Sequence, residues 1–269
     1  MARFESVLVT GASSGIGAAF ARRLATCGTR RMTLVGRDAE RLQALAAELR
    51  QKGVQSTVWT GDLTVLEEVA VLATHIASEP PDLLVNNAGA GHYGAFVDLD
   101  AAPQLATIDL NVRALVALSH AYARAASPRG RGALLLVAST AGFFPVPYEA
   151  VYAATKSFVI LFGEALAEEL RTSGVVVRTL CPGFTATEFA LRAALPKSVV
   201  VGPTADADTV AAAGIAAFGA REVTVVRGRP LQVAAALGRR LPYGMLRRVA
   251  GWWMRRGLQA TGLTARRRT

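Results

Sequence analysis

The sequence predicts a single α/β domain built on a doubly wound parallel sheet of about seven strands. Short apolar runs alternate with longer segments of helical periodicity, which is the pattern of strand–helix–strand units. A glycine-rich turn directly follows the first apolar run. The chain has 269 residues, 52% of them hydrophobic, and one α/β core can extend over a chain of this length.

The expected strands are short runs of mostly apolar residues, as the buried strands of a parallel sheet usually are. They cover Ser6–Val9, Met32–Val35, Val54–Thr60, Leu83–Val85, Ala133–Ala138, Val175–Leu180 and Glu222–Val226. The helices expected between them cover Gly15–Cys27, Ala39–Gln51, Val65–Ser78, Pro103–Ala126, Glu149–Thr172 and Ala205–Gly219. Right-handed crossovers would bring the C-terminal ends of the strands to one edge, where ligands bind in such sheets.

The turn after the first strand, residues 10–17, places its glycines in a G-x-x-x-G-x-G spacing and opens the first helix. Glycines let the backbone approach a pyrophosphate, and the helix N-terminus offers free N–H groups and a favourable dipole. The turn therefore predicts a dinucleotide site, although a plain structural turn is the alternative when it is considered alone. The predicted cofactor-binding residues here are Gly11, Ser13, Ser14, Gly15, Ile16 and Gly17.

A second pattern joins Tyr152 and Lys156, which are four residues apart, with Ser139 thirteen residues before the tyrosine. Four residues are one helical turn, so the phenol and the ammonium project from the same helix face. A free phenol titrates at about 10, and a nearby ammonium favours its ionised form. With a serine hydroxyl holding the substrate oxygen, these groups could move a proton onto or off a carbonyl or alcohol oxygen.

Together with further short motifs, these two patterns resemble the short-chain dehydrogenase/reductase family. The matching residues are Thr10–Gly17, Asp62-Leu63, Asn86–Gly89, Asn111, Ser139, Tyr152, Lys156 and Pro182-Gly183, in the family's order over about residues 4–190. The resemblance implies a Rossmann-type fold, a nicotinamide cofactor, hydride transfer to or from a carbonyl carbon, and a homodimer or homotetramer. More loosely, residues 142–147 resemble a subgroup of ketone and acyl-chain reductases with an apolar C-terminal extension.

The resemblance also implies roles for individual residues. Tyr152 would exchange the proton with the substrate oxygen, Ser139 would position that oxygen, and Lys156 would lower the tyrosine pKa and bind the nicotinamide ribose. Asn111 would hold a water that links the lysine to solvent. The implied cofactor contacts are Asp62 and Leu63 at the adenine, Asn87, Ala88 and Gly89 at the ribose, and Pro182, Gly183, Thr185 and Thr187 at the nicotinamide end, with Tyr152 and Lys156.

Three of these residues also have structural interpretations. Asp62 could cap a helix, and the Asn87 amide could tie the central strands together. Asn111 lies in an apolar helix, which is an awkward place for an amide unless partners are supplied. The lone histidines His92 and His120 are interpreted as ordinary residues, and no metal site is predicted.

The end of the second strand bears on the choice of cofactor. NAD-dependent enzymes place an acidic residue there for the ribose 2′-hydroxyl, whereas this chain has Gly36 and then Arg37. A guanidinium can pair with a 2′-phosphate and stack on adenine. We therefore expect NADP (NADPH) rather than NAD, with a solvated surface arginine as the alternative. Ser14 stands where many NADP-using relatives carry a basic residue, and Asp38 is expected to cap the next helix.

The net charge of +10 is concentrated in residues 231–269, which contain nine arginines and no Asp, Glu or Lys. We expect residues 1–230 to form the catalytic domain and residues 231–269 a basic amphipathic extension, not an independent domain. Met245, Val249, Trp252 and Trp253 recur at helical spacing among the arginines. The extension could pack over the substrate cleft or a partner subunit, or lie on an anionic membrane. A nucleic-acid partner is not expected.

Cys27 and Cys181 form no disulfide or zinc pattern, and the first strand begins too early to leave room for a signal peptide. No membrane span is expected. These features predict a cytoplasmic protein, with peripheral membrane contact through the extension as an addition.

The segments that would face the substrate, residues 90–96, 142–150 and 184–203, are apolar. They favour a hydrophobic ketone, aldehyde, acyl or steroid-like substrate. A non-catalytic dinucleotide sensor or a membrane-associated scaffold is the alternative.

Overall fold

A computed structural model describes residues 3–200, 204–228, 232–233 and 240–260 of the chain. The predictions for the other residues, including those for arginines 239 and 266–268 of the extension, lie outside the described residues. The prediction of a doubly wound α/β fold is confirmed, because seven parallel strands form one sheet with helices between them. The strands are β1 (Ser6–Thr10), β2 (Arg31–Gly36), β3 (Gln55–Thr60), β4 (Leu83–Asn86), β5 (Gly132–Val137), β6 (Val175–Cys181) and β7 (Thr224–Val226).

The strand order in the sheet is β3-β2-β1-β4-β5-β6-β7. The order reverses between β1 and β4, which pair in parallel through Val7↔Leu83 and Val9↔Val85. At such a reversal the connections leave the sheet on opposite faces, so a crevice opens beyond the C-terminal ends of the strands. The turn after β1 and the segment after β4 therefore meet at the position where a dinucleotide binds in folds of this type.

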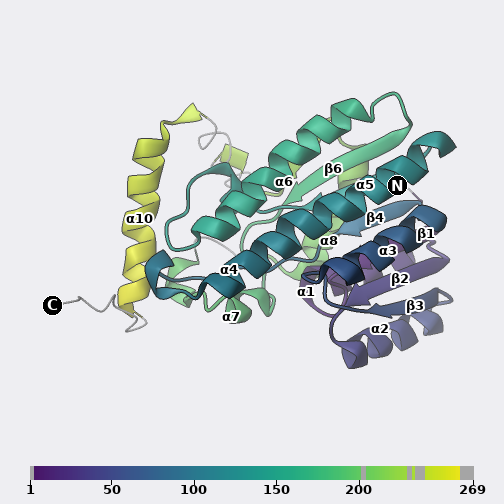
Figure 1. Cartoon of the computed structure of the whole chain (residues 1–269), viewed down its shortest axis with the longest axis horizontal. Coiled ribbons are helices and arrows are strands. Elements are labelled where there is room, and N and C mark those ends of the chain that lie inside the picture. The colour runs from purple at the N-terminus through teal and green to yellow at the C-terminus, as the bar shows by residue number, and fades with distance from the viewer. Residues whose placement is uncertain (1–2, 201–203, 229–231, 234–239, 261–269) are drawn as a thin grey trace.

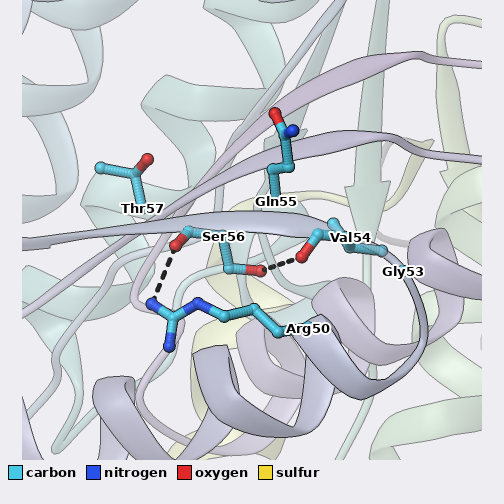
Figure 2. A pocket seen from close by; sticks show the side chains of 6 residues that line it. All are labelled: Arg50, Gly53, Val54, Gln55, Ser56 and Thr57. Carbon is cyan, nitrogen blue, oxygen red and sulfur yellow. Dashed lines mark hydrogen bonds between the residues drawn. The ribbon is translucent and has the colours of Figure 1, made fainter.

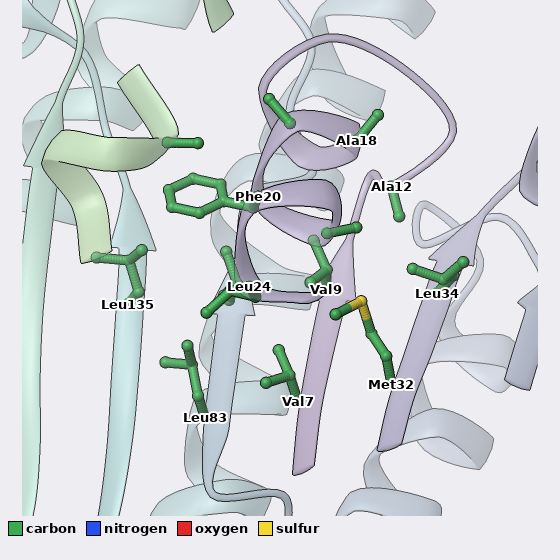
Figure 3. Close-up of a cluster of buried hydrophobic side chains, with 14 of the residues drawn as sticks. Val7, Val9, Ala12, Ala18, Phe20, Leu24, Met32, Leu34, Leu83 and Leu135 are labelled. Carbon is green, nitrogen blue, oxygen red and sulfur yellow. The ribbon is translucent and has the colours of Figure 1, made fainter. Parts of the chain in front are cut away.

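Helices cover both faces of the sheet (Figure 1). The α-helices in the part of the chain that the structure describes are α1 (Gly15–Thr26), α2 (Ala39–Gln51), α3 (Leu66–Ser78), α4 (Ala101–Ile108), α5 (Leu115–Ala126), α6 (Ala150–Glu169), α7 (Phe189–Arg192), α8 (Ala207–Ala216) and α10 (Tyr243–Ala260), of which α10 lies apart from the sheet. Alternating strand residues separate the two sides of the core, since successive side chains point to opposite faces. Val7 and Val9 pack with Phe20 and Leu24 of α1 (Figure 3), whereas Leu8 belongs to the opposite cluster beneath α3, α5 and α6.

The predicted helix Pro103–Ala126 is wrong in its start and in its regularity. Helix α4 begins two residues earlier, at Ala101, and a π-helical segment over Asp109–Ala114 separates it from α5. A π segment inserts an extra residue into the helical ladder and is frequent at functional sites. This one contains Asn111, so the irregularity lies where a catalytic residue was predicted.

Among the described residues, one helix is long and apolar enough to cross a membrane by length and composition alone. That helix is α6, which carries Tyr152 and Lys156. Its side chains Val159 and Ile160 are buried in the core cluster beneath the sheet. Core helices of folded domains pass the same test of length and composition. Packing on the sheet accounts for the buried side of α6, whereas Phe158 and Leu161 of the same helix are 39% and 72% exposed.

Helix α10 stands at one end of the molecule, away from α1 and α2 (Figure 1). Its Met254 is 6% exposed and belongs to a third apolar cluster with Tyr93, Val146, Ala153 and Val199. These partners come from the segments after β4, β5 and β6 and from α6. One side of α10 therefore packs against the loops expected to face the substrate.

Replacing Met254 with alanine is expected to lower the free energy of opening of α10 by about 2–5 kcal/mol, because a buried methionine is truncated without a replacement. Hydrogen exchange should show faster exchange over residues 243–260 and unchanged protection in the sheet. The matched control is Met245→Ala, since Met245 lies on the same helix and is 47% exposed. Equal exchange in the two variants would contradict the packing described for Met254.

Candidate active site

The glycine turn forms a tight cradle between β1 and α1. Gly11 and Gly15 have φ angles of +67° and +54°, which favour glycine. A Cβ on Gly17 would lie 2.2 Å from the Gly11 carbonyl oxygen, so only glycine allows α1 to approach the turn this closely. Ser14 caps α1 by its backbone position and makes no side-chain capping bond. The first N–H groups of α1 are therefore left for an anionic ligand, and the residues fit a dinucleotide pyrophosphate.

The segment after β4 is fastened to this turn by Asn87 and Thr10. The Asn87 amide donates to the Thr10 carbonyl over 2.9 Å, and Thr10 Oγ1 accepts from the backbone N–H groups of Asn87 and Ala88, both over 3.0 Å. A Cβ on Gly11 would lie 3.0 Å from Ala88 Cα. The interpretation of Asn87 as a tie between the central strands is thus confirmed, and the tie holds residues 87–89 beside the turn.

Ser139, Tyr152 and Lys156 are brought together where β5 ends and α6 begins. Ser139 lies two residues after β5 and accepts a hydrogen bond from the Ala141 N–H over 3.1 Å. Lys156 Nζ donates to the carbonyl of Val137, the last residue of β5, over 2.9 Å, and lies 5.8 Å from the centroid of the Tyr152 ring. Serine, tyrosine and lysine therefore share one corner of the sheet edge, as the sequence spacing predicts.

Lys156 also lies next to the segment after β4, which joins this corner to the glycine turn. A Cβ on Gly89 would lie 3.2 Å from Lys156 Nζ and 3.2 Å from Asn111 Oδ1. The predicted ribose-binding segment and the predicted catalytic groups are therefore in contact. A group bound along residues 87–89 would lie within reach of the lysine ammonium.

Burial dominates the electrostatics of the Tyr152 and Lys156 pair. Burial raises the pKa of Tyr152, and the Ser139 hydroxyl is the neighbour that lowers it. Burial also lowers the pKa of Lys156 to about 8. The lowering of the tyrosine pKa by the Lys156 ammonium stays a prediction, because in the protein alone that ammonium donates to the Val137 carbonyl.

Asn111 has every partner that a buried amide needs. Its Oδ1 accepts from the Ala90 N–H over 2.9 Å, and its Nδ2 donates to the Ala90 carbonyl over 2.9 Å and to Thr155 Oγ1 over 3.0 Å. Thr155 Oγ1 in turn donates to the Tyr152 carbonyl over 2.7 Å. Asn111 therefore braces α6 against the segment after β4. Its Oδ1 can accept one further hydrogen bond, and the water at this residue stays a prediction.

At the other end of the site, Arg37 and Asp62 lie at the ends of β2 and β3. The Arg37 side chain is 68% exposed and its Nη1 is 3.5 Å from Asp62 Oδ2, a long and weak ion pair. Asp62 Oδ1 accepts from the Thr64 N–H over 2.9 Å and from its hydroxyl over 2.8 Å. Hydrogen bonds from Thr64, and the charge of Arg37, lower the pKa of Asp62 against the opposing effect of its partial burial. Both side chains remain able to turn toward a ligand.

The structure also decides which residues cap the helices at this end of the site. Val65, not Asp62, occupies the N-cap of α3, so the interpretation of Asp62 as a helix cap is wrong. Asp38 caps α2 as predicted, accepting from the Arg41 N–H over 3.0 Å. Leu63 is 5% exposed and packs in the core, which leaves only its backbone to meet an adenine ring.

The segment after β6 lies beside Ser139 and the glycine turn, at the end of the site where the nicotinamide is predicted. The Pro182 carbonyl accepts from the Thr140 N–H over 2.9 Å, which places Pro182 and Gly183 beside the serine. Thr185 Oγ1 donates to the Gly183 carbonyl over 3.0 Å. Thr187 touches the glycine turn, since its Cγ2 would lie 3.1 Å from a Cβ on Gly15. All the predicted cofactor-binding segments thus converge on one edge of the sheet.

The Tyr152 ring lies against two of the segments that the sequence predicts to face the substrate, residues 90–96 and 184–203. The Phe189 ring lies 5.3 Å away between centroids, and a Cβ on Gly91 would lie 2.8 Å from Tyr152 Cδ2. Phe189 belongs to α7, a short helix that was not predicted.

A surface hollow of about 370 Å³ lies away from this corner, where α2 ends and β3 begins (Figure 2). Its polar groups bond to one another: Arg50 Nη2 donates to the Ser56 carbonyl over 3.1 Å, and Ser56 Oγ to the Val54 carbonyl over 3.3 Å. The guanidinium therefore covers part of the edge strand β3. The hollow contains none of the groups described above. The sheet edge where the predicted cofactor-binding segments converge is therefore the better candidate for the functional site.

Glu149 is a residue of the site that the sequence patterns did not predict. It precedes Tyr152 by three residues and is 8% exposed, and its carboxyl group makes no hydrogen bond or ion pair with any residue that the structure describes. Burial raises the pKa of Glu149 to about 7, and its charge raises the pKa of Tyr152. Tyr148, just before it, has a φ of +70°, a strained value for a tyrosine. The sequence signal for this residue is an acidic side chain about one helical turn before the tyrosine.

Replacing Glu149 with glutamine is expected to shift the pH profile of alcohol oxidation to lower pH. Oxidation needs the tyrosine as its phenolate, and above about pH 7 the Glu149 carboxylate opposes that ionisation. The measurement is kcat/KM against pH. The control is Glu169→Gln, an exposed acid on the same helix. Identical profiles for wild type and Glu149→Gln would show that this carboxyl does not act on the tyrosine.

The fold and site define a dinucleotide-binding oxidoreductase, with a glycine cradle at the strand-order reversal and a serine, tyrosine and lysine beside it. Residues 5–195 match the model of the short chain dehydrogenase family. The chain belongs to this family, the short-chain dehydrogenases/reductases, and is an NAD(P)-dependent oxidoreductase acting on CH–OH groups and the corresponding carbonyls.

Relatives within the family differ in the compounds their names specify. Sulfoacetaldehyde reductase 2 of Chromohalobacter salexigens is 40% identical over 195 residues, covering 70% of this chain and 75% of that protein. The very-long-chain 3-oxoacyl-CoA reductase of Macaca fascicularis is 31% identical over 192 residues, covering 69% of this chain and 61% of that protein. A short-chain dehydrogenase from Sphingobium yanoikuyae, solved in complex with NADPH, is 34% identical with a TM-score of 0.79, covering 98% of this chain and 97% of that chain.

Proposed function

We propose that this protein is an NADPH-dependent reductase of a hydrophobic ketone, aldehyde or acyl compound. A steroid-like compound is a further candidate substrate. The observation that carries the substrate class is the apolar surround of Tyr152. Phe189 lies against the phenol, and the cluster of Tyr93, Val146 and Val199 continues from it beneath α10. A polar substrate would leave its hydrogen-bonding groups without partners on such walls. The relatives support carbonyl reduction but span a small polar aldehyde and a long acyl chain, so their names do not choose the substrate.

The preference for NADPH rests on Arg37. It follows β2 directly, where an acidic residue would serve NAD, and its guanidinium is exposed and held only by a long contact to Asp62. A 2′-phosphate would be a better partner for it than this carboxylate, because a phosphate offers more oxygens and charge. The similar structure solved with NADPH supports the same choice.

In the proposed reaction the bound nicotinamide supplies the hydride, and the side chains supply the proton and the geometry. Ser139 donates a hydrogen bond to the carbonyl oxygen and holds it near the phenol. Tyr152 gives its proton to that oxygen as the hydride reaches the carbon, so the carbonyl becomes an alcohol. Lys156 binds the nicotinamide ribose, and Asn111 with Thr155 holds α6 so that the phenol stays aligned.

The raised pKa of Tyr152 suits this direction, because a protonated phenol is the form that acts as an acid. A non-catalytic dinucleotide sensor is not favoured, since it would have no use for a serine, tyrosine and lysine gathered at one corner.

We place the enzyme in the cytoplasm, where NADPH drives reduction. A homodimer or homotetramer is part of the proposal, and sedimentation of the purified protein tests it. Leu105 of α4 and Leu161 of α6 are exposed and could contribute to its contact.

The test is a panel of aldehydes and methyl ketones of increasing chain length, assayed for NADPH and NADH oxidation with purified protein. We expect kcat/KM to rise with apolar length, by up to about tenfold for each two methylenes buried. We also expect higher kcat/KM with NADPH than with NADH. Higher activity on short, charged aldehydes than on apolar ketones would contradict the substrate class while leaving the reaction type intact.

A further inference from the structure

The inner side of α10 is held against the substrate-side loops by two hydrogen bonds and lies close to Pro147. The Tyr93 hydroxyl donates to the Met254 carbonyl over 2.7 Å, and Trp253 Nε1 makes a longer bond of 3.4 Å to the Val199 carbonyl. Gly251 is buried, and a Cβ on it would lie 3.4 Å from Pro147. These contacts fix which side of the helix faces the protein and therefore which side faces away.

The opposite side of α10 is apolar and exposed. Met245, Val249 and Trp252 have the spacing i, i+4, i+7, which puts them on one helix face, and they are 47%, 64% and 49% exposed. Trp252 and Met254 are two residues apart, so their side chains point to roughly opposite sides of the helix. Burial of Met254 thus turns the stripe of Met245, Val249 and Trp252 outward.

Arginines border this stripe. Arg248 and Arg255 are exposed and lie four residues before and three residues after Trp252, on one edge of the stripe. The guanidinium of Arg256 stacks over the Trp252 ring, with its central carbon 3.9 Å from the ring centroid. We call the stripe and these three arginines the outer face of α10. No acidic residue occurs from position 231 to the C-terminus.

We propose that the outer face of α10 binds the surface of an anionic lipid bilayer. A helix that places tryptophan and aliphatic side chains between arginines can insert the former among acyl chains while the guanidinium groups pair with lipid phosphates. A second copy of the chain is a poorer occupant, because a twofold contact would set the arginines of one copy against those of the other. Nucleic acid would pair with the arginines but leave Met245 and Val249 unburied.

Docking in this way would also orient the active site. The inner side of α10 rests on Tyr93, Pro147 and Val199, which belong to the loops around the substrate side. A bilayer bound on the outer face would therefore lie one helix diameter from the region where a hydrophobic substrate is expected. A reductase held there would meet an apolar substrate at the lipid surface, where such a compound concentrates.

The test is co-sedimentation of the full-length protein with vesicles of phosphatidylcholine alone and of equal parts phosphatidylcholine and phosphatidylserine. We expect binding to the anionic vesicles only, falling as salt screens the arginines over a Debye length of about 8–10 Å near physiological ionic strength. Each arginine at an anionic surface contributes about fivefold to the affinity, so Arg248→Glu with Arg255→Glu should weaken binding at least about 25-fold. Trp252→Ser should weaken it at low and high salt alike, because it removes apolar insertion.

The matched control is Arg124→Glu with Arg131→Glu, which changes the charge equally at exposed positions before the start of β5, at the opposite edge of the sheet. It should retain most of the vesicle binding, and NADPH oxidation with a soluble ketone should be unchanged in all variants. Equal loss in the control, or no binding to anionic vesicles, would overturn the proposal. So would a dimer that Trp252→Ser dissociates, or DNA binding stronger than vesicle binding, since either would identify another occupant. Vesicle binding needs no turnover, so its failure leaves the proposed reaction untouched.

Discussion

Replacing Tyr152 with phenylalanine is expected to lower kcat for carbonyl reduction by about 10²–10⁴-fold and to leave NADPH affinity nearly unchanged. Only the proton donor is lost. The phenylalanine ring can occupy the same space between Phe189 and Gly91. The brace from Thr155 is also kept, because its hydroxyl donates to the backbone carbonyl of residue 152 and not to the phenol.

Two measurements separate chemistry from binding: single-turnover rates of NADPH oxidation, and calorimetric titration of NADPH into the free enzyme. Tyr243→Phe serves as the control, since that tyrosine is 70% exposed at the start of α10 and should change neither quantity. A Tyr152→Phe enzyme that turns over at nearly the wild-type rate would remove Tyr152 from the mechanism.

Replacing Arg37 with aspartate is expected to raise the NADPH dissociation constant by about 10–100-fold and to change that of NADH much less. The substitution removes a charge-assisted hydrogen bond to the 2′-phosphate and adds a repulsive carboxylate. The new carboxylate would then lie beside that of Asp62, whose Oδ2 is 3.5 Å from the Arg37 guanidinium in the unchanged protein. The ratio of the two dissociation constants, measured by fluorescence titration, reports the preference directly.

The control for that variant is Arg30→Asp, which changes the net charge equally at an exposed position just before β2, at the opposite edge of the sheet. It should weaken NADPH and NADH binding equally and slightly, through the long-range field alone. If Arg37→Asp also affects the two cofactors equally, Arg37 is a surface arginine and the preference for NADPH has another cause.

The strands, the glycine turn and the tyrosine–lysine pair were predictable because each is a pattern among near neighbours in sequence. Alternating or continuous apolar residues mark a strand, and a spacing of four residues puts Tyr152 and Lys156 on one face of a helix. The family motifs then predicted which strand ends meet, since the residues after β1, β4, β5 and β6 carry them. These local patterns do not depend on contacts with distant parts of the chain.

The missed features depend on contacts between residues far apart in the chain. The π segment at Asn111 is held by bonds to Ala90 and to Thr155, 44 positions away, which no helical periodicity reveals. Burial of Glu149 and Lys156, and hence their shifted pKa values, follows from packing around the start of α6. Ionisation depends on the dielectric environment and neighbouring charges, which only the assembled fold supplies.

The C-terminal helix shows both kinds of information in one element. The sequence by itself determined that residues 243–260 can form a helix with apolar and arginine positions, because that follows from a period of 3.6 residues. Only the tertiary structure decided which side faces the protein, through the bond from Tyr93 to Met254, 161 positions apart. A helix that is apolar on two sides has two equivalent candidates for burial until another segment packs against one of them. That contact leaves Met245, Val249 and Trp252 to the solvent.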